Sequence, residues 1–360
     1  MEELGRIQSK YKGKSRLSIF DSFWKKLAER IGVDLIISKV NQVFNWQQSS
    51  LLPRIAHLEQ QLKTLNVSNQ AVSKGTQIVL AIRYRELARE GLVPSFADVE
   101  FRNYSQTGKD GILHFIFSLI GTHNKMCVEI CAGTGSECIS ANLILSHGWY
   151  GLLVDGDPEN VESGQNFYKE HPDSKLIPPC FLHRWVSRES VNPIIEEAGF
   201  GGEIDLLTID MDGIDYWIWD AITVTNPRVV VIEFLAHFPG RAITVPYRED
   251  FVGTWIPYDG DDAKSDLSKD ESRIGHGGKL SRWSTYYGGA SLAAFVKLGK
   301  QKGYRLIGAN STGYNAFFLR NDIGSDLFPE VDESACYNKL LQSFILNDAE
   351  KLKHYEFQEV

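Results

Sequence analysis

Several absences narrow the classes of protein to which this 360-residue chain can belong. It has no long hydrophobic run: Val229–Ile232 is one of the longest, whereas a membrane-spanning helix needs about 20 apolar residues. It has no excess of positive charge, because 38 Lys and Arg face 46 Asp and Glu for a net charge of −8. Proteins that coat DNA or RNA neutralise phosphates with Lys and Arg. We therefore expect a small-molecule substrate, and neither a membrane nor a nucleic acid as partner.

Cysteine motifs and an apolar leader are also lacking. The five cysteines have no C-x-x-C spacing; they are Cys127, Cys131, Cys138, Cys180 and Cys336. Three of them fall in or near a strand and helix that should be buried, as reduced cysteines do in a cytoplasmic protein. The chain starts Met-Glu-Glu with no apolar stretch, so we expect no secretory signal. The hydrophobic share of 43% is that of a globular protein, and the length suggests about two domains.

The clearest motif is a glycine turn between two acids. Residues 128–135 read Val-Glu-Ile-Cys-Ala-Gly-Thr-Gly, and Asp155 follows Gly135 by 20 residues. This order predicts a strand, a turn, a helix and a second strand, with Gly133 and Gly135 letting backbone approach a nucleotide-like ligand and Asp155 binding ribose hydroxyls. Glu129 would repel a pyrophosphate but suits the ammonium of S-adenosylmethionine. A strand–turn–helix without a ligand is the alternative.

The same stretch resembles motif I of class I methyltransferases, acid-x-G-x-G-x-G. Cys131 takes the place of the first glycine, and the turn survives if the backbone there has a negative φ. A dinucleotide-binding dehydrogenase would need a third glycine three residues after Gly135, where this chain has Cys138. The motif therefore favours S-adenosylmethionine over NAD.

Residues 1–99 predict a helical, glycine-poor N-terminal region. We expect one helix over Ser22–Ile31 and another over Thr76–Glu90, ended by Gly91. Between them, apolar residues step by four and three as in a coiled coil; they are Leu51, Ile55, Leu58, Leu62 and Leu65. This 51–65 helix either forms a homodimer or packs on its own catalytic domain, and both interpretations stay open.

From about residue 100 short apolar strands alternate with helices. We expect strands at 126–131, 150–155, 175–181, 204–210, 228–234, 304–309 and 315–320. The last two flank a short turn and should form an antiparallel hairpin. This predicts an α/β Rossmann-like fold whose mostly parallel sheet, with an antiparallel last strand, is similar to that of class I methyltransferases. We assign residues 100–330 to this domain and 331–360 to a C-terminal helical tail.

Residues 238–289 interrupt the alternation as an insertion of about 50 residues, which is longer than most loops. Aromatic residues argue for order at both ends of this loop; they are Trp255, Tyr258, Trp283, Tyr286 and Tyr287. The charged centre, 261–278, has few apolar positions. We interpret the insertion as a lid over the substrate.

Three carboxylates follow two neighbouring strands. Asp210 and Asp212 alternate at the end of the fourth strand and Glu233 ends the fifth, where α/β proteins bind ligands. Converging carboxylates repel one another, and a divalent cation such as Mg²⁺, Mn²⁺ or Ca²⁺ would remove the conflict. Asp212 capping the next helix is the alternative. His237 is either a proton acceptor, since a histidine side chain ordinarily has a pKa of about 7, or a packed loop histidine.

A wider resemblance covers about residues 100–320. The segments that carry it are Tyr104–Leu113 (Tyr-Ser-Gln-Thr-Gly-Lys-Asp-Gly-Ile-Leu), Cys127-Val128-Glu129, Glu137-Cys138 with Ala141–Ile144, Gly148-Trp149-x-Gly-Leu-Leu and Asp210-x-Asp-Gly. They resemble the FkbM-related methyltransferases of bacterial sugar and natural-product clusters. The resemblance implies S-adenosylmethionine, methylation mostly of hydroxyls, and contacts from Ser105 and Gln106 to the methionine carboxylate. Lys109 stands where the family usually has an acid.

These features predict an S-adenosylmethionine-dependent methyltransferase that O-methylates a small hydroxylated substrate, such as a sugar or natural product. We expect Asp210 to contact the cofactor, His237, Asp212 and Glu233 to be catalytic, and the three carboxylates to bind Mg²⁺. Two other functions stay open. One is an NAD-dependent oxidoreductase, and the other is a catalytically inactive methyltransferase fold that serves as a dimeric scaffold.

Overall fold

The computed structural model describes most of the chain after residue 71. The described residues are 72–257, 283–338 and 352–360, with single positions at 25, 26, 39, 42, 45, 49, 54 and 349; for 255–257 and 283–285 only the backbone is described. The apolar seam expected over 51–65 and the charged centre of the insertion, 261–278, therefore lie outside the described residues. Among the described residues, no helix has the length and apolar character needed to cross a membrane.

The chain divides into two compact units, Met1–Asn69 and Gln70–Val360. The division falls earlier than the boundary that the sequence suggested at residue 100. The reason is that helix α5 (Lys74–Arg89) packs on helix α7 (Lys109–Ile120) within the second unit. The helix expected over Thr76–Glu90 is thus present, but it belongs with the sheet.

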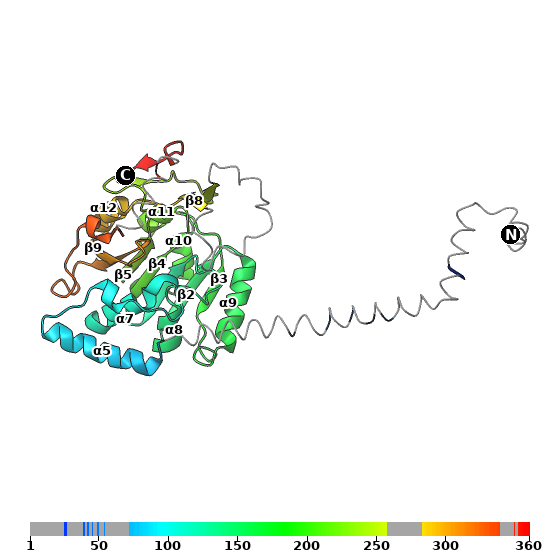
Figure 1. The fold of residues 1–360 in the computed structure, drawn as a ribbon, viewed down its shortest axis with the longest axis horizontal. Coiled ribbons are helices and arrows are strands. Elements are labelled where there is room, and N and C mark those ends of the chain that lie inside the picture. Colours follow the sequence, from blue (N-terminus) through cyan, green and yellow to red (C-terminus); the bar gives the residue numbers. More distant parts are fainter. Residues whose placement is uncertain are drawn as a thin grey trace, which may run out of the picture. The chain divides into compact units, whose positions relative to one another are not determined.

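The second unit is built on one seven-stranded sheet (Figure 1). Its strand order is β3-β2-β1-β4-β5-β10-β9, and only β10 runs antiparallel to its neighbours among the described pairs. The bounds are β1 Met126–Ile130, β2 Tyr150–Asp155, β3 Cys180–His183, β4 Gly202–Ile209, β5 Thr225–Glu233, β9 Tyr304–Ala309 and β10 Asn315–Arg320. The predicted Rossmann-like class I methyltransferase sheet, mostly parallel with an antiparallel last strand, is confirmed.

One strand is displaced from its predicted place. The sequence suggested a strand over 175–181, but β3 begins at Cys180. Pro178 and Pro179 precede it, and proline supplies no N–H to a strand ladder. The apolar residues Leu176 and Ile177 that favoured an earlier start are exposed.

Helices cover both faces of the sheet, and each face has its own core (Figure 1). One core gathers α5, α7, α8 and α9, and the other gathers α10, α11 and α12. The remaining bounds are α6 Phe96–Val99, α8 Ala141–His147, α9 Pro158–Glu170, α10 Val191–Glu197, α11 Asp215–Ala221, α12 Leu292–Lys302, and the 3₁₀ helices η2 Gln106–Gly108 and η5 Glu333–Cys336. Side chains alternate along a strand, so neighbouring residues of one strand enter different cores.

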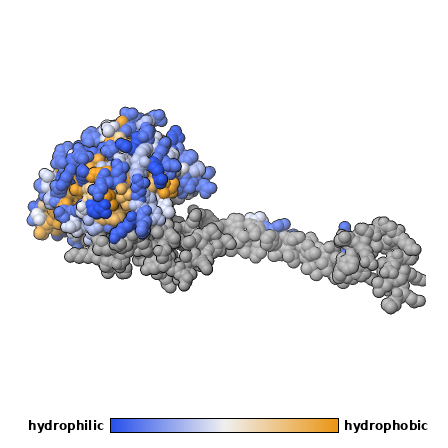
Figure 2. All heavy atoms as spheres, turned by 90° about the horizontal axis from the view of Figure 1, so that it is seen from above, coloured by the Kyte–Doolittle hydropathy of each residue, from blue (hydrophilic) through white to orange (hydrophobic). Residues whose placement is uncertain are grey.

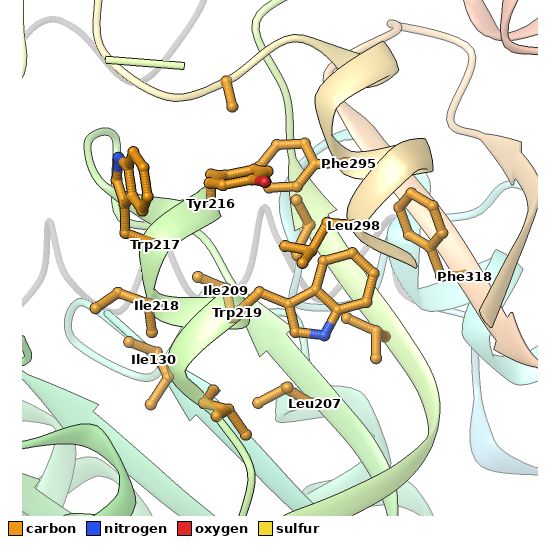
Figure 3. Close-up of a cluster of buried hydrophobic side chains, with 14 of the residues drawn as sticks. Ile130, Leu207, Ile209, Tyr216, Trp217, Ile218, Trp219, Phe295, Leu298 and Phe318 are labelled. Carbon is orange, nitrogen blue, oxygen red and sulfur yellow. The ribbon is translucent and has the colours of Figure 1, made fainter. Parts of the chain in front are cut away.

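Trp219 of α11 is the largest fully buried side chain of the second core (Figure 3). Its ring centroid lies 5.1 Å from that of Phe318 and 6.3 Å from that of Phe295. Gly299 of α12 makes this possible, since a Cβ there would stand 3.1 Å from both Trp219 and Phe318. Truncating such a buried aromatic typically costs about 3–5 kcal/mol. This packing fixes α11, and with it the loop that leads from β4 into α11.

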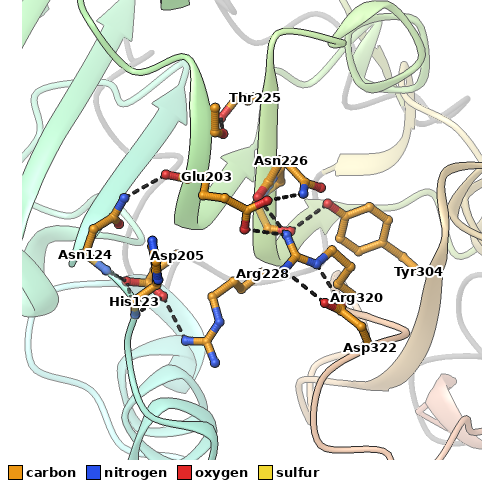
Figure 4. A network of polar contacts seen from close by, with 12 residues as sticks. His123, Asn124, Glu203, Asp205, Thr225, Asn226, Arg228, Tyr304, Arg320 and Asp322 are labelled. Atoms are coloured by element: carbon orange, nitrogen blue, oxygen red, sulfur yellow. Dashed lines mark hydrogen bonds and ion pairs between the residues drawn. The ribbon is translucent and has the colours of Figure 1, made fainter.

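A polar network joins the amino ends of β1, β4 and β5 at the edge of the sheet opposite their carboxyl ends (Figure 4). Asp205 is fully buried, and its carboxylate accepts hydrogen bonds from three successive backbone N–H groups, those of His123, Asn124 and Lys125. Arg228 donates to it at 2.9 Å. A buried carboxylate with this many donors holds the turn between α7 and β1 in place.

The insertion is partly ordered. It contains β6 (Ile243–Thr244) and an antiparallel pair, β7 (Thr254–Pro257) with β8 (Trp283–Tyr287). Strand β6 pairs with β11 (Gln358–Glu359), which the prediction of a helical C-terminal tail missed. The expected order around Tyr286 and Tyr287 is therefore present.

The face shown in Figure 2 is largely hydrophilic, with apolar residues in scattered patches.

Candidate active site at the carboxyl ends of the strands

The turn after β1 is unusually rich in left-handed backbone. Cys131, Gly133 and Gly135 have φ values of 63°, 55° and 71°. The turn therefore forms without the negative φ that was set as its condition at Cys131. Two hydrogen bonds hold it: Ala132 N–H donates to Val154 O of β2 at 3.0 Å, and Gly135 N–H donates to Ala132 O at 2.9 Å. A Cβ at Gly133 would have no atom within 4 Å, so the backbone there is open to a ligand.

Gly135 faces inward instead. A Cβ on it would stand 2.9 Å from Phe181 and 3.0 Å from Tyr168, and the Tyr168 hydroxyl donates to the Gly135 carbonyl at 2.8 Å. The helix expected to open at this glycine begins later, at Ala141. Gly135 therefore lets the turn pack against α9 and β3.

Asp155 lies beside the open glycine. It is 7% exposed, and its Oδ2 accepts from Gly133 N–H at 2.8 Å. Its Oδ1 accepts from Asp157 N–H at 2.9 Å and from the Asn160 amide at 3.2 Å. Asp155, the second acid of the motif, is thus bonded directly to the part of the turn that is open to a ligand.

Glu129 points into the protein. It is 2% exposed and accepts from Ile139 N–H at 2.7 Å and from both the N–H and the hydroxyl of Ser140. Burial raises the pKa of Glu129, although these hydrogen bonds oppose the shift. Its carboxylate anchors the segment that precedes α8, which leaves little of it for an external ammonium.

Ser105 and Gln106 take different positions in the loop before α7. Ser105 is fully buried: its N–H donates to Asp110 Oδ2 at 2.9 Å, and its hydroxyl accepts from Asp110 N–H at 3.0 Å. Gln106 is exposed, and its amide donates to Glu137 at 3.2 Å. Ser105 therefore shapes the loop, whereas Gln106 is accessible to a ligand.

Asp210, Asp212 and Glu233 come together. One carboxylate oxygen from each lies within 4.8 Å of the others, and we call this group the acidic cluster. Asp210 follows β4, and Glu233 ends β5 opposite Asn315 of β10. Residues directly opposed in an antiparallel pair share a face, so Asn315 extends the polar edge. Asn315 is 2% exposed, and its amide nitrogen lacks a hydrogen-bond partner among the described atoms.

Lys109 is the residue of this site that sequence reasoning missed. It is the first residue of α7, is 6% exposed, and its Nζ lies 3.5 Å from Asp210 Oδ2. The lysine stands in the same segment as Ser105 and Gln106, but nothing in its spacing connects it to β4. It brings a positive charge to carboxylates whose mutual repulsion the sequence analysis expected a metal ion to relieve.

Crowding and burial shift the acid–base properties of the acidic cluster. The pKa of Glu233 is raised well above its usual range, first by burial and then by the charges of Asp210 and Asp212. The pKa of Asp212 is raised by the same two kinds of effect, burial first. Glu233 as a residue is only partly exposed, and its carboxyl is buried. Glu233 is thus the carboxyl that holds a proton most readily.

Asp215 holds the loop that carries Asp212. It is the first residue of α11, and its carboxylate accepts from Met211 N–H at 2.8 Å and from Gly213 N–H at 3.0 Å. Burial raises the pKa of Asp215 to about 7. The alternative role for Asp212 as a helix cap is therefore wrong, since Ile214 occupies the N-cap and makes no side-chain cap. Asp212 is exposed as a residue, although protein atoms surround its carboxyl closely enough to raise the pKa, and it adopts a left-handed φ of 54°.

His237 differs from its expected chemistry. Burial lowers its pKa to about 4, whereas the sequence suggested an ordinary pKa of about 7. It follows β5 by four residues (237 − 233), and its ring centroid lies 6.5 Å from that of Phe238. His237 is consequently neutral at pH 7 and a weak proton acceptor.

Comparison with known proteins finds only distant structural neighbours. No family model and no curated protein matches the chain. It is similar to the magnesium protoporphyrin IX methyltransferase of Synechocystis with bound S-adenosylmethionine, at 13% identity over 54% of this chain and 69% of that one, with a TM-score of 0.30. It is also similar to an S-adenosylmethionine-dependent methyltransferase of Clostridium acetobutylicum, at 12% identity over 67% of this chain and 97% of that one, with a TM-score of 0.36. These values are too low to carry an inference about function.

Proposed function

We propose that this protein is an S-adenosylmethionine-dependent methyltransferase that methylates a hydroxyl group of a small substrate. The observation that supports it best is the parallel order β2-β1-β4 of the sheet. It brings Asp155, at the end of β2, and Asp210, directly after β4, to the same edge as the glycine turn that follows β1. The carboxyl ends of β1, β2 and β4 thus form one acidic edge beside open glycine backbone. Such an edge attracts a cationic nucleoside and repels a pyrophosphate.

The residues of this edge fit the cofactor. When bound, S-adenosylmethionine supplies an electrophilic methyl group on a positively charged sulfur. Gly133 offers bare backbone, and Asp155 Oδ2 accepts one hydrogen bond from the described chain, which leaves a lone pair for a ribose hydroxyl. Gln106 is the accessible polar residue of the loop before α7, while Ser105 and Glu129 support the edge from within.

The acidic cluster is the proposed place for the acceptor hydroxyl. Its three carboxylates also suit a divalent cation such as Mg²⁺, which prefers oxygen ligands and when bound would polarise that hydroxyl. Lys109 already offsets part of the negative charge, and the raised pKa of Glu233 favours its neutral form. A metal-free site is therefore the runner-up, and chelation separates the two.

Methylation of a hydroxyl releases a proton, and the chain must accept it. Asp212 is exposed and has a raised pKa, which brings it closer to the ideal for a general base than an ordinary aspartate. His237, with a pKa of about 4, is a weaker candidate. We therefore assign the proton to Asp212 ahead of His237. The resemblance to FkbM-related methyltransferases supports a hydroxyl as the acceptor.

Calorimetry with S-adenosylmethionine, S-adenosylhomocysteine and NAD tests the cofactor assignment. Asp155→Ala should weaken S-adenosylmethionine binding by about 1–3 kcal/mol, the usual loss when a hydrogen-bond partner is removed. Asp157→Ala is the matched control, because it removes a neighbouring carboxylate that caps α9 and should leave affinity unchanged. Equal affinity of wild type and Asp155→Ala for S-adenosylmethionine would contradict the assignment of Asp155 to the cofactor site. Binding of NAD alone would favour an oxidoreductase, and binding of neither would favour a scaffold.

Chelation and substitution test the acidic cluster. EDTA should abolish turnover if a divalent cation binds there and leave it unchanged in the metal-free site. In the metal-free site, Asp212→Asn should lower the rate by about 10²–10⁴-fold, the span of a general base, and His237→Ala should lower it less. A rate that survives EDTA and both substitutions would remove this cluster from the mechanism.

A further inference from the structure

The two described ends of the insertion close around the backbone of Asp212. Tyr286 of β8 donates its hydroxyl proton to the Asp212 carbonyl at 2.6 Å. Gly289 N–H donates to the next carbonyl, that of Gly213, at 2.7 Å. The segment from Asp212 to Gly213 is thus held from outside by residues more than seventy positions later in the chain.

Two glycines allow this close approach. A Cβ on Gly288 would stand 2.6 Å from the Asp212 carbonyl oxygen, and one on Gly253 would overlap both that oxygen and the Tyr286 hydroxyl. Gly253 comes directly before β7 and Gly288 directly after β8. Any larger residue at either position would push the insertion away from Asp212.

The backbone held in this way is strained. Asp212 has a φ of 54°, a conformation that residues other than glycine adopt rarely and at a cost of about 1–3 kcal/mol. Asp215 fixes the flanking N–H groups of Met211 and Gly213. Only a backbone restrained on several sides keeps such a conformation, and the conformation determines where the Asp212 carboxylate points.

We infer that Tyr286 is a positioning residue: its hydroxyl holds Asp212 in the left-handed conformation that brings the carboxylate into the acidic cluster. The inference rests on the proposed function, in which Asp212 meets the acceptor hydroxyl. It gives the insertion a defined part in the site. Tyr286 acts through the Asp212 backbone and exchanges no proton with the substrate.

The neighbouring tyrosine provides a matched control. Tyr287 stands on the same strand, and its hydroxyl donates to the Glu356 carbonyl at 2.7 Å, away from Asp212. In the full-length protein, Tyr286→Phe should lower kcat about tenfold and leave KM for S-adenosylmethionine unchanged. Tyr287→Phe should change neither constant, although it removes the same chemical group.

A double-mutant cycle separates positioning from general support of the fold. If Tyr286 acts through Asp212, Tyr286→Phe should lower kcat less than twofold in an Asp212→Asn background, because the carboxylate it positions is gone. A tenfold loss in both backgrounds would overturn the inference. Crystal structures of wild type and Tyr286→Phe decide the same point without turnover: Asp212 should leave the left-handed region in the variant. An unmoved Asp212 overturns the inference, whereas an inactive wild type refutes the proposed function alone.

Discussion

Arg228→Met should lower the free energy of unfolding more than any single substitution at the exposed ion pairs nearby. Asp205 is fully buried, and Arg228, whose side chain is 13% exposed, supplies the only opposite charge bonded to it among the described residues. Arg228 also donates to the carbonyls of Ile120 and Gly121, at 3.0 and 2.7 Å. Methionine keeps much of the side-chain volume but removes the charge and all three bonds.

The structure sets the size of the effect. Removing one partner of a buried ion pair usually costs about 3–5 kcal/mol, because the remaining charge stays buried without compensation. The three backbone N–H groups that bond Asp205 remain, so we expect a loss near the lower end, about 3 kcal/mol. Total stabilities are typically about 5–15 kcal/mol, so the shift would be large.

Urea unfolding followed by tryptophan fluorescence measures this loss, and Glu203→Gln is its control. Glu203 pairs with Arg320 at 2.7 Å in the same network, but its side chain is 43% exposed (Figure 4). An exposed pair contributes less than about 1 kcal/mol. Equal losses for Arg228→Met and Glu203→Gln would refute the argument that burial makes the Asp205 pair important.

Three further predictions concern charge and assembly. Burial lowers the pKa of His147 to about 4, so between about pH 6.5 and about pH 4 the unfolded chain binds a proton at this residue that the folded protein does not; the Tm of the wild type relative to that of His147→Gln should therefore fall from pH 6.5 to 4.5 and stay level above, and a difference that is independent of pH contradicts this. Lys109→Met should raise Mn²⁺ affinity at least tenfold by calorimetry, because the competing ammonium beside Asp210 is gone; an unchanged affinity contradicts this. If the 51–65 helix forms a homodimer, Leu58→Glu with Leu62→Glu should give a folded monomer by light scattering, whereas an unchanged mass contradicts it.

Much of the sheet could be predicted because strand periodicity and turn residues are local signals. The strands over 150–155, 304–309 and 315–320 were predicted with the bounds that β2, β9 and β10 have. The strand over 175–181 failed for a local reason as well, since two prolines displace its start. The order of strands follows from the Rossmann-like pattern rather than from any one residue.

The site was predictable only in part. Asp210, Asp212 and Glu233 could be expected to converge because parallel strands end at one edge. Lys109 could not, since its contact with Asp210 depends on how α7 packs across a hundred residues of sequence. The left-handed backbone of Cys131 also carries no sequence signal, because cysteine seldom adopts it.

The pairing of β11 with β6 has a consequence for the order of folding. Tyr287 bonds to Glu356, Lys297 Nζ donates to the Val360 carbonyl at 2.7 Å, and Val360 N–H donates to the Ala242 carbonyl at 3.0 Å. The C-terminal partners in these bonds, Glu356 and Val360, leave the ribosome after all seven strands of the sheet, and domains begin to fold during synthesis. A nascent chain can therefore complete its sheet before the insertion beside the acidic cluster is braced, so the site is finished later than the scaffold that carries it.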